Sequence, residues 1–196
     1  MKQQIDCVIV GAGISGLMAA HSLQASGANV TLFDKGRGVG GRLATRWVEV
    51  EGGEKGYFDH GAQFFTVREP RFQSFVDDWL AAGVVTEWSR GFANAAEMTN
   101  NDGHSRYCGR NGMNAIARHL AANLHVQSNA KVERLSCIGE QWRVTLESGY
   151  EAVADAVILT PPVPQSLALL DAGACTLPDA AQASLAALTY DPCFAV

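Results

Sequence analysis

The sequence feature that most constrains this chain is the stretch GAGISG at residues 11–16, which separates a strand pattern from a helix pattern. The residues before it, IDCVIV at 5–10, form the short apolar, β-branched run expected of a parallel strand buried on both faces. From residue 14 to about residue 26, apolar side chains recur at helical spacing, and a second strand pattern, NVTLFD, follows at 29–34. These segments predict a β-α-β unit at the start of an α/β fold.

The three glycines of GAGISG match the pattern G-x-G-x-x-G at a place where each has a physical role. Gly11 allows a tight turn from strand to helix, Gly13 lets the backbone approach a pyrophosphate, and Gly16 lets the helix pack closely on the sheet. The amino end of the helix attracts phosphate, and Ser15 adds a hydroxyl donor. Asp34, at the tip of the second strand, is placed to accept both ribose hydroxyls and disfavours a 2′-phosphate. The pattern predicts dinucleotide binding, with FAD and NAD both open at this point.

A second glycine-rich stretch, KGRGVGGRLAT at residues 35–45, follows directly and carries three cations. It indicates a loop that lies against an anion, and because the chain has a formal net charge of −5, such a site has to be local. A simple nicotinamide dehydrogenase continues from its second strand into a crossover helix, whereas this loop is placed to return to the pyrophosphate. Arg42 suits a bidentate contact with phosphate oxygens. The alternative is a flexible basic loop surrounded by solvent.

Together, VIVGAGISGLMAA and VTLFDKGRGVGGRLAT resemble the FAD-dependent amine oxidase superfamily, in which a G-G-R motif follows the ribose-binding acid. Three later stretches, FDHGAQFFTVR, YCGRNGMNAIARHLA and AVILTPPVPQ, are similar to bacterial renalase-like NAD(P)/FAD-dependent oxidoreductases. The resemblance extends over nearly the whole chain. It implies a Rossmann-like FAD-binding fold with an interleaved substrate domain. Nothing in the sequence indicates a covalent link to the flavin, so we expect non-covalent FAD.

The resemblance also implies contacts along the whole cofactor. From the pyrophosphate outward they fall on Gly11, Gly13, Ser15 and Gly16, then on Asp34 at the ribose with Lys35 nearby, on Gly41 and Arg42 at the phosphate and ribityl oxygens, on His60, Gly61, Ala62 and Gln63 at the flavin ring, on Val132 at the adenine, and on Thr160 with Pro161 over the cofactor. For His60 the alternative is a histidine hydrogen-bonded inside a turn. The role of Gln63 is equally open.

We expect a discontinuous FAD-binding domain over residues 1–65 and 108–161, and a partial substrate domain over 66–107 and 162–196. The chain ends in LTYDPCFAV, which has the pattern of an apolar strand that is just beginning. The C-terminal glycine motif of the superfamily is missing as well. Both features lead us to expect a C-terminally truncated chain.

Periodicity predicts two further helices, at residues 70–83 and 112–124, and richness in alanine and leucine predicts two more, at 164–170 and 180–188. The segment 125–162 predicts successive strands with hairpin turns near 138–141 and 148–149, ending in the buried strand AVILT, and the polar stretch 94–106 predicts a loop. The spacing of seven aromatic residues favours a hydrophobic core over a substrate cavity. They are Phe64, Phe65, Phe72, Phe75, Trp79, Trp88 and Phe92.

The composition of the chain bears on where the protein is located and on which classes of partner it binds. Apolar runs stay shorter than the roughly 18 residues that span a bilayer, and the acidic balance disfavours nucleic acid and anionic membranes. The five cysteines are odd in number and lack a C-x-x-C pair, which argues against a disulfide framework or a metal site and favours the cytoplasm. A small-molecule substrate is the expected partner.

The expected activity is that of an FAD-dependent oxidoreductase, which transfers a hydride from a small organic substrate to flavin and is reoxidised by O2 to give H2O2. The renalase resemblance implies a dihydronicotinamide isomer as substrate, and the wider superfamily implies an amine or a polyene. Two alternatives stay open: a non-catalytic FAD- or NAD-binding sensor module, and a plain NAD-dependent dehydrogenase. The sequence assigns no catalytic residue and no oligomeric state.

Overall fold

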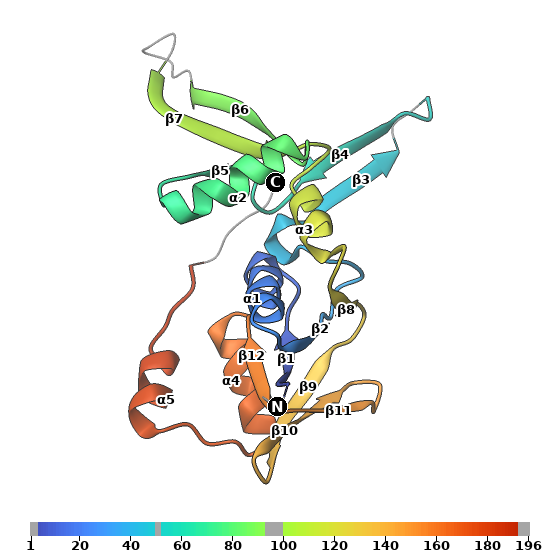
Figure 1. Ribbon diagram of the computed structural model, residues 1–196, viewed down its shortest axis with the longest axis vertical. Coiled ribbons are helices and arrows are strands. Elements are labelled where there is room, and N and C mark those ends of the chain that lie inside the picture. The colour runs from blue at the N-terminus through green and yellow to red at the C-terminus, as the bar shows by residue number, and fades with distance from the viewer. Residues whose placement is uncertain (1–3, 50–51, 93–99, 192–196) are drawn as a thin grey trace. The chain divides into compact units, whose positions relative to one another are not determined.

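The computed structural model describes residues 4–49, 52–92 and 100–191 (Figure 1). The chain forms two compact units, one built from the residues up to Gly41 and from Leu120 onward, the other from Arg42–His119. The boundaries between the units fall after Gly41 and before Leu120, whereas the sequence predicts domain boundaries at 65, 108 and 161. The domain assignment from the sequence stays a prediction.

The first unit is centred on a parallel sheet with the strand order β12-β1-β2-β8. Its strands are β1 (Asp6–Val10), β2 (Asn29–Phe33), β8 (His125–Gln127) and β12 (Ala156–Leu159), and α1 (Ile14–Ala25) connects β1 to β2. The register pairs the last residues of β1, β2 and β12, so these strands end together at one edge of the sheet. The predicted β-α-β unit is confirmed.

Alternate side chains of the central strands are buried on both faces of this sheet. Val10 and Phe33 belong to one hydrophobic cluster, while Ile9 and Leu32 occupy the alternate positions and are fully buried as well. An apolar strand without polar alternation is the pattern of a sheet covered on both sides. The structure therefore confirms the prediction that was drawn from IDCVIV.

A three-stranded antiparallel sheet, ordered β11-β10-β9, supplies the other side of that hydrophobic cluster. Its strands are β9 (Val132–Ile138), β10 (Gln141–Leu146) and β11 (Glu151–Ala154). Both predicted hairpin turns are confirmed, and each places a glycine at positive φ, Gly139 at 59° and Gly149 at 84°. The chain continues into α4 (Val163–Ala172), which packs on β9, and then into α5 (Asp179–Ala186), both close to the predicted ranges.

The second unit contains a hairpin, a small antiparallel sheet and the helix α2. The hairpin pairs β3 (Thr45–Glu49) with β4 (Lys55–Asp59); the sheet, ordered β5-β7-β6, contains β5 (Phe65–Thr66), β6 (Val85–Phe92) and β7 (Asn100–Gly109); and the helix is α2 (Pro70–Ala81). The chain passes from the first unit to the second within a short 3-10 turn, η1 (Gly41–Leu43), and returns to the first unit within the helix α3 (Asn114–Ala121). The predicted helices in this region are confirmed.

The prediction of a loop over residues 94–106 is wrong from residue 100 onward, because β7 begins there and is the central strand of its sheet. Its sequence, NNDGHSRYCG, has little β-propensity in its first half. Pairing with β6 along most of its length supplies the backbone hydrogen bonds, and such tertiary pairing overrides local preference. Residues 94–99 lie outside the described residues.

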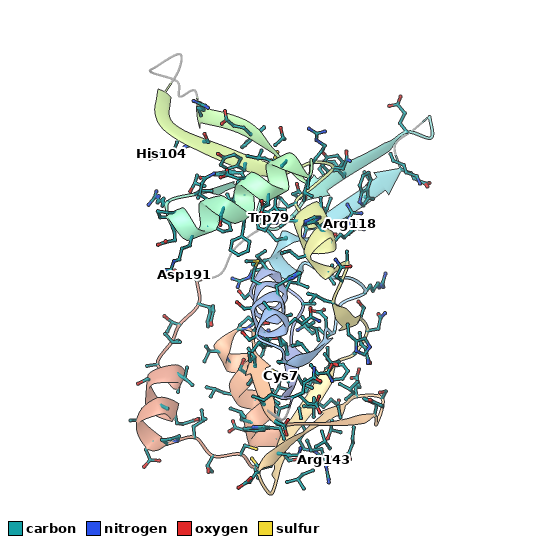
Figure 2. The ribbon with its side chains drawn as sticks, viewed as in Figure 1. Cys7, Trp79, His104, Arg118, Arg143 and Asp191 are labelled. Carbon is teal, nitrogen blue, oxygen red and sulfur yellow. The ribbon has the colours of Figure 1, made fainter. Side chains whose placement is uncertain are left out.

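Aromatic side chains contribute to the core of the second unit, which confirms the core prediction for some of the seven aromatic residues. Trp79 on α2 is buried and meets Phe65 and Phe72 edge-on, with ring centroids 6.3 and 5.9 Å apart (Figure 2). Phe65 also stacks on Tyr107 of β7 at 5.6 Å. The core prediction is wrong for Phe75 and Trp88, which are 41% and 53% exposed. The side chain of Phe92 lies outside the described part.

Candidate dinucleotide-binding site

The first glycine motif lies at the edge of the sheet where β1 ends, and two of its glycines are required by close packing. Gly11 has a φ of 101°, and a Cβ there would clash with the Thr160 hydroxyl. A Cβ on Gly16 would clash with the carbonyl oxygen of Gly11. Both glycines therefore serve the tight strand–helix connection that the sequence predicts.

Gly13 differs from its neighbours because it faces open space. Its φ and ψ are −75° and 179°, an extended conformation that any residue adopts. A Cβ there would have no atom from a residue remote in sequence within 4 Å. Neither backbone strain nor packing thus requires a glycine at this position. A glycine here leaves room for a ligand to approach the backbone closely, and a diphosphate fits this place.

The amino end of α1 begins at this open position and has the features of an anion site. Gly13 is the N-cap of α1 and has no side chain that could cap the helix. The first turn of α1, all of whose residues the structure describes, contains no acidic residue. The first backbone bond of the helix runs from the Leu17 N–H to the Gly13 carbonyl at 3.0 Å, so the preceding N–H groups are oriented toward the helix end. Together with the helix dipole, these groups favour a phosphate.

The second glycine loop docks onto the first one. Gly13 and Gly40 form a parallel bridge, and the Gly40 N–H donates to the Ala12 carbonyl at 2.9 Å. A Cβ on Gly41 would lie 3.4 Å from the Cα of Gly13, so the approach of the two backbones leaves little room for a side chain. The prediction that this loop returns to the first turn is confirmed, and the alternative of a solvent-surrounded loop is wrong for its backbone at residues 40–41.

Asp34 links the two loops through its carboxylate. One oxygen, Oδ2, accepts the Ala12 N–H at 2.6 Å, and the other, Oδ1, accepts the Gly36 N–H at 2.7 Å. Each carboxylate oxygen has a further lone pair, so the group can still accept hydrogen bonds from ribose hydroxyls. The carboxylate thus has a structural role that the sequence did not reveal, while its contact with ribose stays a prediction.

Three more of the predicted contact residues lie in the same unit. The Thr160 hydroxyl donates to the Val10 carbonyl at 2.9 Å and supports the strand end beneath Gly11. Lys35 is exposed, and its Nζ donates to the side chain of Gln165 at 3.1 Å. Val132 opens β9 with its side chain buried. Their contacts with the cofactor stay predictions.

Arg42 and residues 60–63 belong to the second unit, where their two motifs pack against each other. The Ala62 N–H donates to the Arg42 carbonyl at 2.8 Å, and a Cβ on Gly61 would clash with that same carbonyl. The side chains of Arg42, His60 and Gln63 are exposed. The His60 side chain makes no hydrogen bond to a residue that the structure describes, so the alternative of a turn-bound histidine finds no support there.

A hydrogen-bonded network at the start of α3 connects two further motifs and was missed by sequence reasoning. Asp59 Oδ1 accepts the Thr45 hydroxyl at 2.5 Å and the Met113 N–H at 2.9 Å, and Thr45 Oγ1 accepts the Asn114 N–H at 3.0 Å. Side chains distant in sequence therefore cap this helix. The sequence offers one indirect sign of this network: Gly112 and Met113, just before α3, have no side chain suited to capping a helix, so the cap has to come from elsewhere in the chain.

The Asp59 carboxylate also affects its surroundings electrostatically. Burial, and to a lesser degree this nearby negative charge, raise the pKa of the Cys108 thiol. Cys108 is therefore kept in the thiol form at neutral pH. Reactivity as a nucleophile depends on the thiolate, so this residue is a poor candidate for covalent catalysis.

The described residues contain neither a metal-binding cluster nor a membrane-spanning helix. Over 4–49, 52–92 and 100–191, no three His, Cys, Asp or Glu side chains come together as a group able to hold a metal ion. In the same ranges, every helix is too short or too polar to cross a lipid bilayer.

The parallel sheet and the glycine turns are those of a Rossmann-type fold. The family model described as an NAD(P)-binding Rossmann-like domain matches residues 9–79. A second model, described as flavin containing amine oxidoreductase, matches residues 67–196, which is more than half of the chain. The chain belongs to the flavin-containing amine oxidoreductase family, and the resemblance drawn from its motifs is confirmed.

Individual relatives agree with this family. The chain is 27% identical to renalase of Mus musculus over 179 residues, which cover 83% of this chain and 48% of renalase. It is 41% identical over 70 residues to protoporphyrinogen oxidase 2 of Arabidopsis thaliana, covering 36% of this chain and 13% of that protein. The crystal structure of a fatty acid isomerase from P. acnes shares the fold, with a TM-score of 0.68 at 12% identity, over 95% of this chain and 64% of that one. The chain thus spans about half the length of mouse renalase.

Proposed function

We propose that the chain binds one FAD non-covalently and is part of an enzyme that oxidises a small organic molecule. The observation that carries this proposal is the docking of the Gly40–Gly41 turn onto the Gly13 turn, beside the amino end of α1 that no described side chain caps. One glycine turn is enough for a structural role. Two turns that meet at an open, electropositive helix end are best explained by a diphosphate that both enclose.

Each part of this site has a distinct task in the proposal. The N–H groups at the start of α1 bind the diphosphate, the open face of Gly13 lets it approach, and Asp34 accepts ribose hydroxyls while it ties the loops together. For Arg42 and residues 60–63 we propose contacts with the phosphate and the flavin ring. Family resemblance supports them, and so does the packing of these two segments on each other.

A bound FAD would supply the redox chemistry, namely acceptance of a hydride from the substrate and reoxidation by O2 to H2O2. The likeness to renalase supports a dihydronicotinamide isomer as the substrate, and the family supports an amine as the second candidate. The chain then has to bind and orient the substrate, because the flavin supplies the redox chemistry. The four free cysteines that the structure describes support a cytoplasmic location as part of the same proposal.

The experiment is anaerobic reduction of the flavin in the purified, FAD-loaded chain with a panel of dihydronicotinamides and primary amines. We expect the bound flavin to absorb at about 450 nm, to be released on denaturation, and to be bleached by one class of substrate. A chain that binds FAD but is bleached by no compound of the panel would support the sensor module. A chain that takes up NAD and no FAD would overturn the proposal.

A further inference from the structure

Two cysteines that are far apart in sequence lie side by side in the first unit. Cys137 is near the end of β9, and Cys175 follows the end of α4. Their Sγ atoms are 3.8 Å apart, and both thiols are free. Cys137 is exposed to solvent, whereas Cys175 is half-buried and also donates to the Leu135 carbonyl at 3.1 Å.

Regular elements hold both thiols in place. The Cys175 N–H donates to the Leu170 carbonyl at 2.9 Å, and Gly173 packs so closely on the Leu135 carbonyl that a Cβ there would clash. Leu135 and Leu170 are buried in the same hydrophobic cluster. The strand and the end of the helix are therefore fixed to each other, and the sulfur atoms stay near each other because their backbones do.

From this geometry we infer that Cys137 and Cys175 form a reversible disulfide when the chain meets a peroxide. A disulfide has an S–S length of about 2.05 Å, so the sulfur atoms have to approach by about 1.8 Å, which side-chain rotation of the exposed Cys137 can supply. The bond would join the end of α4 to β9. This site is separate from the glycine turns and does not depend on the proposed enzyme activity.

The reaction takes two steps and consumes one peroxide. The Cys137 thiol loses its proton, its sulfur attacks one oxygen of H2O2, and the O–O bond breaks to give Cys137 sulfenic acid and hydroxide. The hydroxide takes up the released proton and becomes water. The Cys175 sulfur then attacks the Cys137 sulfur, the S–O bond breaks, and the hydroxyl leaves with the Cys175 proton as a second water. Two thiols are oxidised to one disulfide, and two electrons reduce the peroxide.

The different surroundings of the two thiols assign these roles. Cys137 meets solvent and therefore an added oxidant first. Burial, followed by the hydrogen bond with Cys137, raises the pKa of the Cys175 thiol, which suits the residue that resolves a sulfenic acid rather than the one that attacks peroxide. Cys7 is only 3% exposed and lies within the parallel sheet, so it is protected from the same reaction (Figure 2).

The test is oxidation of the purified chain, first reduced and desalted, with a small molar excess of H2O2. We expect the thiol count under denaturing conditions to fall from five to three, the intact mass to fall by two hydrogens, and a peptide map to link residues 137 and 175. Dithiothreitol should restore all five thiols. The variants Cys137→Ser and Cys175→Ser should lose the link, while Cys108→Ser, the matched control, should retain it.

A second measurement follows the consequence of the bond for stability. The loop closed by the disulfide is long, so the oxidised wild type should melt at least about 5 °C above its reduced form. The Cys175→Ser chain should show no such shift after the same treatment. Sulfinic acid at Cys137 without a link to Cys175, a link that joins other cysteines, or disulfides only between separate chains would each overturn the inference.

Discussion

The open space at Gly13 leads to the sharpest prediction about the cofactor. The change is Gly13→Ala, which adds one methyl group where no atom from a residue remote in sequence lies within 4 Å of the new carbon. Its φ of −75° is available to alanine, so the free chain should fold as before, with its stability changed by less than about 1 kcal/mol. If FAD binds as proposed, the same methyl group occupies the path of the diphosphate.

The expected loss of affinity follows from the groups at the amino end of α1. A diphosphate displaced by a methyl group loses about two charge-assisted hydrogen bonds to the first-turn N–H groups, and each such bond contributes about 1.5 kcal/mol. The sum of about 3 kcal/mol corresponds to a Kd raised about 100-fold. The helix end itself stays intact, because Gly13 caps it through the backbone alone.

Gly38→Ala is the matched control, because Gly38 is exposed, has no positive φ and also has open space around its missing Cβ. FAD is titrated into flavin-free wild type, Gly13→Ala and Gly38→Ala while flavin fluorescence is recorded, and each chain is melted without FAD. We expect weak binding for Gly13→Ala only, with similar melting temperatures for all three. Equal affinity of both variants and the wild type would show that the diphosphate does not approach Gly13.

Three further predictions concern other groups of the chain. Arg42→Ala should weaken flavin retention by about 1.5–3 kcal/mol, measured as the Kd for FAD; an unchanged Kd would remove Arg42 from the proposed site. Asp59→Ala should lower the free energy of unfolding in urea by about 1–2 kcal/mol, because α3 loses its cap, whereas the exposed Asp171→Ala should have little effect. The hydrogen bond from Gln141 lowers the pKa of Asp155, so its ionised carboxylate stabilises the fold above the ordinary pKa, and this contribution is lost as pH falls through the lowered value. Melting temperatures from pH 7 to 2 should therefore show an advantage of wild type over Asp155→Asn that shrinks below about pH 4, and a constant difference would contradict this.

Much of the first unit is predictable from the sequence because its signals are local. The β-α-β unit depends on apolar spacing within a few residues, and the hairpin turns of the antiparallel sheet depend on glycines at positive φ. Gly11 and Gly16 are also of this kind, since the turn itself leaves no room for their side chains. The family followed from the same short motifs, in which position and residue type are tied together by backbone geometry.

Only the tertiary structure decided the features that depend on long-range contacts. The polar strand β7 forms because its neighbours supply backbone partners, and α3 is capped by Asp59, which lies 54 positions before the N–H group that it accepts. The two thiols of Cys137 and Cys175 meet because α4 packs on β9. The spacing of apolar residues in the sequence indicates which face of a helix or strand is buried, but it does not indicate which distant segment covers that face. For this chain, therefore, the sequence determined most of the elements and the glycine turns, while packing between remote segments decided the polar strand β7 and which side chains meet.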